Sequence, residues 1–350
     1  MELFKPCGKP QGLFIMWEEI ISFKNLYLAY KLAARKKYYR KEVLVFSSNL
    51  AENLLQIQTE LKNKTYQIGE YRQTIVYDPK RRLIMALPFR DRVVQHALNT
   101  YIEPLFDRQM IFATFACRKT KGTHAAAQKA QSYSRKYKYY LKLDIHHYFA
   151  SVNTELLYNT MAKIINQEDT NWLLKTILES NPNTGLPIGN LLSQLSANFN
   201  LHYIDFYVKV KLSIKGYVRY MDDMIVFSNS KEELWNILNL LDKKTAEFNL
   251  RFNHKTTVGL TKYGITYVGY RLWPNNKLIK KISIQRMKRK FKAWKNHKMT
   301  NTKYFQSLAS WSGHVTHSDS HAIVNKILLQ TISEQNKRLA ILSTTKDRGK

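Results

Sequence analysis

Three aspartates stand at the ends of apolar segments, where their carboxylates could act together. Asp144 ends a predicted buried strand, YYLKLDI (139–145), and Asp222 and Asp223 lie at the tip of a predicted hairpin, YVRYMDDMIVF (217–227). Clustered carboxylates repel one another and raise one another's pKa unless a cation neutralises them. Two Mg²⁺ ions about 3.5–4 Å apart would do so, clamping an attacking 3′-oxygen and a triphosphate during in-line displacement. An Asp-Asp pair taken alone is more often an ordinary turn, but the flanking strands favour the metal site.

The elements around these aspartates alternate between strands and helices. The first 60 residues predict helices, residues 67–87 predict two short strands joined by a turn at 78–80, and Pro88 is expected to open a helix. Another helix is expected from about Asn153, with an apolar face of Leu156, Leu157, Thr160, Met161, Ile164 and Ile165. This alternation predicts an α+β fold, with helices on one face of a sheet.

Three further helices are expected in the second half of the chain. The segment 185–209 predicts a loop that leads into a long helix, and Ser230 with Glu233 predicts a capping box at the start of the next. Residues 277–298 hold ten Lys/Arg and no Asp/Glu, and their apolar residues recur at helical spacing: Ile284, Met287, Phe291 and Trp294. This pattern indicates a packed helix with a cationic outer face and a domain boundary near Pro274. Its candidate contacts with nucleic acid are Arg286, Arg289 and Lys292.

The composition indicates a folded protein with a polyanionic partner. Of the 350 residues 44% are apolar, which is enough to fill a core and excludes a wholly disordered chain. The excess of 56 Lys+Arg over 26 Asp+Glu gives a formal charge of +30 and points to nucleic acid or an anionic membrane surface. The two cysteines exclude a zinc knuckle or a disulfide framework. The sequence has neither a secretory signal pattern nor an apolar run approaching ~20 residues, so a soluble cytoplasmic protein is expected.

Several segments match one known family in type and in order. The catalytic motif of reverse transcriptases resembles Tyr220-Met221-Asp222-Asp223, and their first and second palm motifs resemble LKLDIHHYF and GLPIGNLLSQ. The two motifs that follow resemble RFNHKTTV and ITYVGYRLWP, and the fingers motifs of the bacterial enzymes resemble YDPKRRLIMALPFRDRVVQHAL and FACRKTKGTH. The closest resemblance is to the enzymes of diversity-generating retroelements, and it extends to SLASWSGH (307–314).

This resemblance implies a right-hand polymerase fold, in which an antiparallel palm sheet is backed by helices. The expected division is an N-terminal helical extension at 1–60, fingers at 61–139, a palm with interleaved fingers elements at 140–274 and a thumb at 275–350. The implied activity is RNA-directed DNA synthesis by two-metal nucleotidyl transfer.

The same resemblance assigns catalytic and metal-binding residues. Asp144 and Asp222 would hold two Mg²⁺ ions, for which Mn²⁺ can substitute, with the backbone carbonyl of Ile145 as a further ligand. Asp223 would lie close to the metals with a weaker or indirect role. Lys255 falls in the motif whose lysine is placed as the general acid for departing pyrophosphate, although a surface lysine is as often merely solvated.

Other residues are assigned to the incoming nucleotide. Lys80 and Arg82 of the predicted hairpin would grip its triphosphate, since arginine suits bidentate phosphate contact; the alternative is an ordinary solvated turn. Phe149 matches the steric gate that excludes a 2′-hydroxyl, and the alternative for this ring is a place in the core.

The second palm motif departs from that of most reverse transcriptases. Where most have Gln-Gly-x-x-x-Ser-Pro, this chain has Ile188 and Gly189 at the start and Gln194 in place of the proline. A polar amide against the template–dNTP pair is thus replaced by a branched hydrocarbon. The retroelement family shows the same departure, which there accompanies error-prone copying of template adenines; neutral drift at a packing position is the alternative.

The resemblance therefore implies an enzyme that makes mutagenised cDNA from a template RNA. Its expected partners are the RNA template, the RNA/DNA hybrid, dNTPs and a small basic accessory protein, and no membrane. One alternative is a stand-alone antiphage-defence reverse transcriptase of the same branch. Another is a catalytically silent RNA-binding protein, which the intact set of three aspartates disfavours, because clustered acids would repel a polyanion.

Overall fold

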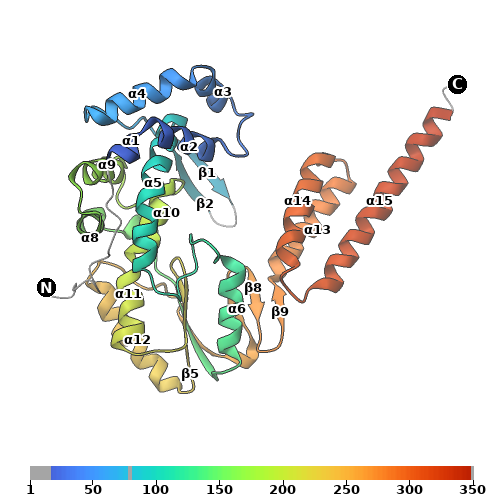
Figure 1. Cartoon of the computed structure of the whole chain (residues 1–350). Helices are drawn as coiled ribbons and strands as arrows, with labels where there is room; N and C mark the ends of the chain where they lie inside the picture. The colour runs from blue at the N-terminus through green and yellow to red at the C-terminus, as the bar shows by residue number, and fades with distance from the viewer. Residues whose placement is uncertain (1–16, 78–80, 348–350) are drawn as a thin grey trace. The chain divides into compact units, whose positions relative to one another are not determined.

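The computed structural model describes residues 17–77 and 81–347, with the side chains of the last helix described as far as Lys337. The chain forms helices and antiparallel sheets (Figure 1), which confirms the α+β prediction. Contacts divide it into two compact units. Unit 1 contains the described part of Met1–Arg118 with Asp144–Ser213 and Asn239–His254; unit 2 contains Lys119–Leu143, Ile214–Leu238 and the described part of Lys255–Lys350. The division into extension, fingers, palm and thumb stays a prediction, because both units draw on several of these ranges.

Unit 1 begins with four helices, as the first 60 residues predicted. They are α1 (Trp17–Ile21), α2 (Phe23–Ala34), α3 (Lys41–Ser48) and α4 (Leu50–Lys62). Figure 1 shows these helices gathered near the start of α5 (Phe89–Gln109), against which α1, α2 and α3 pack. Pro88 stands at the N-cap of α5, as expected. The buried side of α5 includes Val93, Val94, Ala97, Leu98 and Leu105.

A two-stranded sheet follows these helices. β1 (Arg72–Tyr77) pairs antiparallel with β2 (Arg81–Ala86), which confirms both predicted strands. The turn between them, with Lys80, lies outside the described residues. Near the end of β2, the Met85 amide donates to the Ile188 carbonyl at 2.8 Å, which ties the hairpin to the second palm segment.

The remaining helices of unit 1 are short. They are α7 (Tyr148–Ser151), α8 (Thr154–Ile165), α9 (Glu168–Glu179), α10 (Leu191–Asn200), α11 (His202–Phe206) and the π-helix η1 (Tyr207–Lys211). The single long helix predicted within 185–209 is wrong, because the helix is interrupted at Leu201. There the His202 ring lies 2.9 Å from the Phe199 carbonyl and stacks on the Phe199 ring, so local side-chain contacts accompany the break.

α8 buries a narrower face than its sequence predicted. Asn153 accepts the Leu156 amide and caps the helix, which confirms the predicted start. The buried row is Leu157, Met161 and Ile165. Leu156 is 39% exposed, and Thr160 and Ile164 are only half-buried. The prediction was wrong for Leu156 because its row lies one position round the helix from the buried one.

Unit 2 is built on a four-stranded antiparallel sheet. The strands lie in the order β4 (Tyr217–Tyr220), β5 (Asp223–Ser228), β3 (Tyr139–Leu143) and β6 (Thr257–Leu260). α6 (Thr123–Ser134) packs against β4 and β5. The strand and the hairpin predicted around the three aspartates are confirmed, and they are neighbours in this sheet.

α12 (Lys231–Ala246) follows β5 with half of its predicted capping box. The Ser230 hydroxyl accepts the Glu233 amide at 3.2 Å, as predicted. The Glu233 carboxylate, however, bonds the Ser228 hydroxyl, and the Ser230 amide also donates to Ser228 Oγ. In a complete capping box the Glu233 carboxylate would accept the Ser230 amide directly, whereas here the Ser228 hydroxyl lies between them.

A three-stranded sheet and three helices complete unit 2. The strands are β7 (Ile265–Tyr267), β8 (Tyr270–Leu272) and β9 (Lys277–Ile279), after the 3₁₀ turn η2 (Thr261–Tyr263). The helices are α13 (Lys281–Lys295), α14 (Asn301–Val315) and α15 (His321–Asp347). α13 confirms the central part of the basic helix predicted at 277–298, but the prediction was wrong for residues 277–279, which pair with β8 as β9. Met287 and Trp294 are buried, and Trp294 stacks on Tyr304 of α14 with 4.5 Å between ring centroids. None of the described helices combines the length and apolar character needed to cross a membrane.

Candidate active site

The turn that carries Asp222 and Asp223 is held by a buried arginine. Tyr220 pairs with Asp223 across the turn, and Met221 has a left-handed backbone with φ of 53°. This conformation is uncommon for residues that carry a Cβ. Arg219 is fully buried, and its Nη1 donates to the Met221 carbonyl at 3.1 Å. The two carboxylates are therefore presented by a turn of fixed shape.

Asp144 and Ile145 lie against a neighbouring segment of unit 1. The Asp144 carbonyl accepts the Asn253 amide at 2.7 Å, and Asn253 Nδ2 donates to Asp144 Oδ2 at 3.4 Å. Ile145 faces Phe252 in an isolated antiparallel bridge whose hydrogen bonds are made by the flanking residues. Ile145 and Phe252 therefore form a non-hydrogen-bonded pair, in which the N–H and C=O groups of each residue point away from the other strand. The Ile145 carbonyl thus points away from this segment, as an oxygen ligand must.

Strand pairing brings Asp144 and Asp223 to the same end of two neighbouring strands. The last pair of β3 and β5 is Leu143 with Met224; Asp144 directly follows the first and Asp223 directly precedes the second. Carboxylates are hard oxygen donors of the kind that Mg²⁺ prefers. Within the described residues, no group of three or more His, Cys, Asp and Glu side chains is already arranged around a metal position. The fit to a metal therefore rests on donor chemistry and strand pairing.

Lys142 is a candidate functional residue that the sequence analysis missed. Its ammonium lies 3.2 Å from Asp223 Oδ1 and donates to the Thr266 carbonyl at 2.9 Å. Burial lowers the pKa of the nearby Lys280 ammonium, and the charge of Lys142 lowers it further, while Asp223 opposes both effects. Strand alternation could have identified Lys142, because it places this side chain on the same face as Asp144.

Arg82 and Phe149 occupy different environments in unit 1. Arg82 is exposed on β2, opposite Val76. Phe149 is half-buried on α7, and its carbonyl accepts the Leu186 amide at 2.7 Å. Gly185 fits closely against this backbone, because a Cβ there would lie 2.3 Å from the Phe149 carbonyl oxygen. The contact fixes the backbone that carries the Phe149 ring.

The residues of the second palm motif adjoin the β1–β2 hairpin. Ile188 is half-buried, and its carbonyl accepts the Met85 amide described above. Gly189 has φ of +127°, and a Cβ there would lie 2.9 Å from the Met85 carbonyl oxygen, so the position requires glycine. Gln194 is exposed in the first turn of α10, with its Oε1 4.0 Å from Cys117 Sγ. The hairpin thus sets the backbone position of Ile188.

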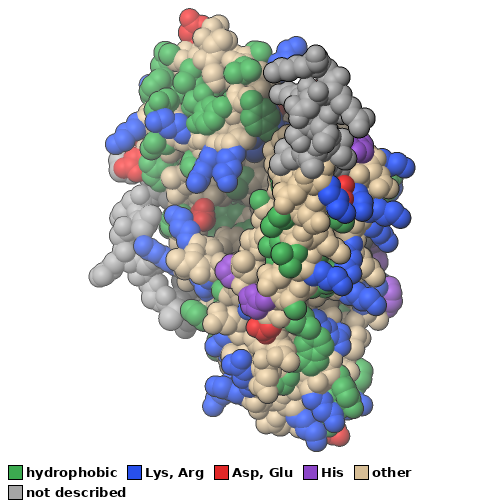
Figure 2. Space-filling view, turned by 90° about the vertical axis from the view of Figure 1, so that its right-hand side faces the viewer, with side chains coloured by type: hydrophobic (Ala, Val, Ile, Leu, Met, Phe, Trp, Pro, Cys, Tyr) green, Lys and Arg blue, Asp and Glu red, His purple; other side chains and the backbone are tan. Residues whose placement is uncertain are grey.

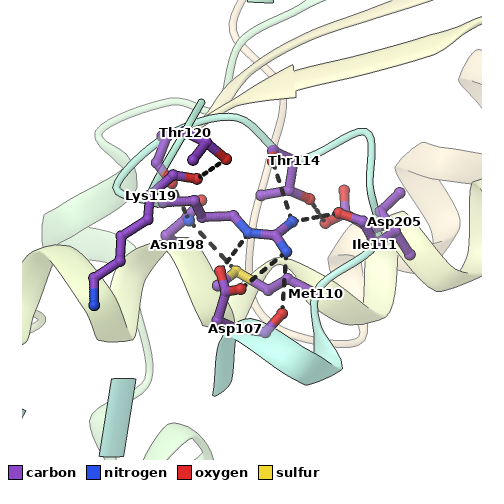
Figure 3. A network of polar contacts seen from close by, with 10 residues as sticks. Asp107, Met110, Ile111, Thr114, Lys119, Thr120, Asn198 and Asp205 are labelled. Atoms are coloured by element: carbon purple, nitrogen blue, oxygen red, sulfur yellow. Dashed lines mark hydrogen bonds and ion pairs between the residues drawn. The ribbon is translucent and has the colours of Figure 1, made fainter. Parts of the chain in front are cut away.

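The loop before α6 is held by another arginine. Arg118 bonds the Asp107 carboxylate and the carbonyls of Ile111 at 2.6 Å and Thr114 at 3.2 Å. Thr114 Oγ1 in turn donates to the buried carboxylate of Asp205 at 2.7 Å. Figure 3 shows these groups as one network. Arg118 therefore stabilises the loop, and among the basic residues of FACRKTKGTH we do not expect it to contact phosphate.

The other candidate residues are basic side chains near the surface. Lys255 is exposed just before β6. On α13, Arg289 and Lys292 are exposed and Arg286 is half-buried. Figure 2 shows Lys and Arg side chains at several separate places in this view, among hydrophobic and uncharged groups, and more of them than acidic side chains. Such a surface suits a polyanion.

Residues 76–272 match a family model described as reverse transcriptase (RNA-dependent DNA polymerase). No curated protein matches the chain. Among solved structures, apo telomerase from Candida tropicalis is similar with a TM-score of 0.50 and 12% identity, over 79% of this chain and 59% of that one. Telomerase from Candida albicans with a TWJ fragment of telomeric RNA has a TM-score of 0.51 and 9% identity, over 83% and 61%.

The chain spans about three-fifths of the length of these telomerases. At such low identity the likeness concerns the fold alone, and it confirms the predicted right-hand polymerase fold. The range that matches the family model includes every residue predicted to bind metal or nucleotide, from Lys80 to Lys255. The basic residues of α13 lie beyond it.

Proposed function

We propose that this chain, which belongs to the reverse transcriptase family, copies RNA into DNA by nucleotidyl transfer. The observation that carries the proposal is the pairing of β3 with β5, which sets Asp144 and the Asp222-Asp223 turn at the ends of adjoining strands within the matched range. In this reaction the 3′-hydroxyl of a primer attacks the α-phosphate of a dNTP, and pyrophosphate leaves. The proposed partners are an RNA template, the growing RNA/DNA hybrid and dNTPs.

Asp144, Asp222 and the Ile145 carbonyl are the proposed ligands of two Mg²⁺ ions, with Mn²⁺ able to substitute. Reverse transcriptases generally depend on divalent metal ions. When bound, the ions would neutralise charge on the attacking oxygen and on the triphosphate. The chain's own part is to orient the ligands: Asn253 bonds the Asp144 carboxylate, and Arg219 fixes the turn that presents Asp222.

Three basic side chains are proposed to act on the phosphates of the incoming nucleotide. Arg82 and Lys80 would hold the triphosphate before the reaction, since guanidinium and ammonium groups pair well with phosphate oxygens. Lys255 would protonate the departing pyrophosphate oxygen. Arg82 and Lys255 are both exposed, which is compatible with these roles.

Primer extension tests the proposed activity directly. A labelled DNA primer would be annealed to an RNA template, and in parallel to a DNA template of the same sequence, and then incubated with dNTPs and Mg²⁺ or Mn²⁺. We expect extension on RNA that requires all four dNTPs and stops when the metal is chelated. Tight binding of the RNA hybrid without any extension, in either metal, would favour the silent RNA-binding protein.

Phe149→Ala is expected to open the sugar pocket to ribonucleotides. If the ring lies beneath the nucleotide, its loss removes a steric clash with the 2′-hydroxyl, and we expect the preference for dNTPs over rNTPs to fall at least about tenfold. The measurement is single-nucleotide insertion with each nucleotide type. The control is Phe206→Ala on α11, which removes an equal ring that is 44% exposed. If Phe149→Ala keeps the wild-type preference for dNTPs over rNTPs, the ring has only a packing role.

Within this family we propose an error-prone enzyme of a diversity-generating retroelement. Ile188 supports this, because a half-buried branched side chain occupies the place of the usual glutamine. Ile188→Gln is therefore expected to lower misincorporation about threefold to tenfold, mainly opposite template adenine, a change of about 1 kcal/mol in transition-state discrimination. Insertion kinetics opposite each template base would measure this, with the half-buried Ile164→Gln of α8 as control. Identical error spectra in wild type and Ile188→Gln would leave Ile188 as packing alone.

The biological setting is proposed from the same resemblance. We propose that the enzyme acts in the cytoplasm with a small basic accessory protein and a template-repeat RNA. The rival is a stand-alone antiphage-defence enzyme, which the same fold and residues would also serve. Sequencing around the gene separates the two, because a template/variable repeat pair beside an accessory gene belongs only with the retroelement.

A further inference from the structure

We propose that Lys142 is a positioning residue whose ammonium holds Asp223, and that Asp223 acts as its partner instead of as a metal ligand. The pair would fix the Asp222-Asp223 turn relative to the β7–β8 hairpin. This inference rests on the proposed polymerase function and assigns different tasks to the two adjacent aspartates.

The geometry around Lys142 links three elements of unit 2. Lys142 lies on β3 and is paired with Ile225 of β5 on one side and with Thr257 of β6 on the other. Its backbone is therefore fixed from both edges, which limits where the side chain can reach. From this position the ammonium contacts Asp223 Oδ1 at 3.2 Å and the Thr266 carbonyl of β7 at 2.9 Å. One cation thus joins the carboxylate of the turn to the backbone of the hairpin.

A second bond runs between the same two elements. Tyr267 is fully buried, and its hydroxyl donates to the Asp223 carbonyl at 3.4 Å. Two consecutive residues of β7 are thereby tied to Asp223, one through the Lys142 ammonium and one directly. The hairpin and the turn are consequently braced at two points, and removal of either point is expected to loosen the other.

The charges of this group favour a division of labour between the aspartates. The Lys142 and Asp223 side chains are 26% and 27% exposed, so solvent screens their attraction only in part. A carboxylate beside an ammonium attracts a divalent cation less than one without such a neighbour, because the two positive charges repel each other. Lys280 adds a second positive charge that acts on Asp223. Metal binding is therefore expected to depend on Asp144 and Asp222 more than on Asp223.

The test is a double-mutant cycle of Lys142→Met and Asp223→Asn. Each single variant and the double variant would be examined by primer extension, by thermal unfolding without metal, and by equilibrium Mn²⁺ binding followed by electron paramagnetic resonance. Lys142→Arg keeps the charge. Lys136→Met makes the same neutralising change at an exposed lysine just before β3 and serves as the matched control.

We expect kcat to fall at least about tenfold in each single variant, with no further loss in the double variant, because coupled residues are not additive. Mn²⁺ affinity should stay within about twofold of wild type in all three, and Lys142→Arg should recover most of the activity. Asp222→Asn, in contrast, should weaken Mn²⁺ binding at least about tenfold.

Three results would overturn the proposal: Lys142→Met behaving like Lys136→Met, additive losses in the double variant, or Asp223→Asn weakening Mn²⁺ binding as much as Asp222→Asn. A wild-type protein that extends no primer would instead contradict the polymerase function. In that case the unfolding and Mn²⁺ measurements still decide whether Lys142 and Asp223 are coupled.

Discussion

Asp222→Ala is expected to remove primer extension, by more than about 10³-fold in kcat, while the affinity for an RNA/DNA hybrid stays equal or rises slightly. The variant loses a proposed metal ligand, and metal-derived charge stabilisation contributes several kcal/mol to reactions of this type. It also loses a negative charge that would repel the nucleic-acid backbone. Single-turnover insertion and equilibrium hybrid binding would measure the two effects separately.

Two controls belong with this experiment. Asp242→Ala removes an exposed carboxylate from α12 and should keep wild-type activity. Asp222→Asn keeps the side-chain volume, so it should be as inactive as Asp222→Ala if charge and metal ligation are what matter. Extension by Asp222→Ala within about tenfold of wild type, at equal thermal stability, would refute the assignment of Asp222 to the metals.

Local pattern was sufficient to predict the strands around the aspartates. Leu141 and Leu143 alternate with polar residues on β3, and apolar residues flank the Asp222-Asp223 tip on both sides, so each strand is specified by its own sequence. Antiparallel pairing of a hairpin is also local, since a tight turn sets its register. The fold class follows from these elements, whereas the pairing of β3 with β5 joins segments some eighty residues apart and was not predicted, because neither strand's own pattern specifies its partner.

Contacts between distant residues explain what the sequence did not predict. The Lys142–Asp223 pair joins two strands, and nothing within either strand indicates the partner of the other. The Ser228 hydroxyl displaces the expected capping partner of Glu233 because β5 ends beside the helix start. The interruption at Leu201 is accompanied by contacts of His202 with Phe199, which the spacing of apolar residues does not predict.

Several site predictions remain predictions for a different reason. Exposure places Arg82 and Lys255 at the surface, but a surface position suits a solvated cation as well as a phosphate contact. Lys80 lies outside the described residues. The backbone geometry is more informative at Gly189, where the close approach of the Met85 carbonyl gives a physical reason for the glycine that the motif contains.

Charge reversal on α13 is expected to weaken template–primer binding irrespective of sequence. In Arg286→Glu/Arg289→Glu/Lys292→Glu, three cations that would neutralise backbone phosphates become repulsive. Each lost contact should lower the salt dependence of binding, so the slope of log K against log salt should decrease by about 2 to 3. Titration of a fluorescent RNA/DNA hybrid at several salt concentrations would measure affinity and slope together, and hybrids of unrelated sequence should be affected equally.

The matched control reverses three exposed lysines of other helices, Lys62, Lys163 and Lys243, and changes the net charge by the same amount. If binding depends on the position of the α13 cations, this control should lose much less affinity and keep most of the slope. An equal loss in both variants would mean that only net charge matters.

Arg286 is half-buried, so thermal unfolding must show that the triple variant is folded. The double variant Arg289→Glu/Lys292→Glu changes only exposed side chains, and we expect it to show about two-thirds of the decrease in slope seen in the triple variant. Unchanged affinity and slope in that double variant would show that α13 does not contact nucleic acid.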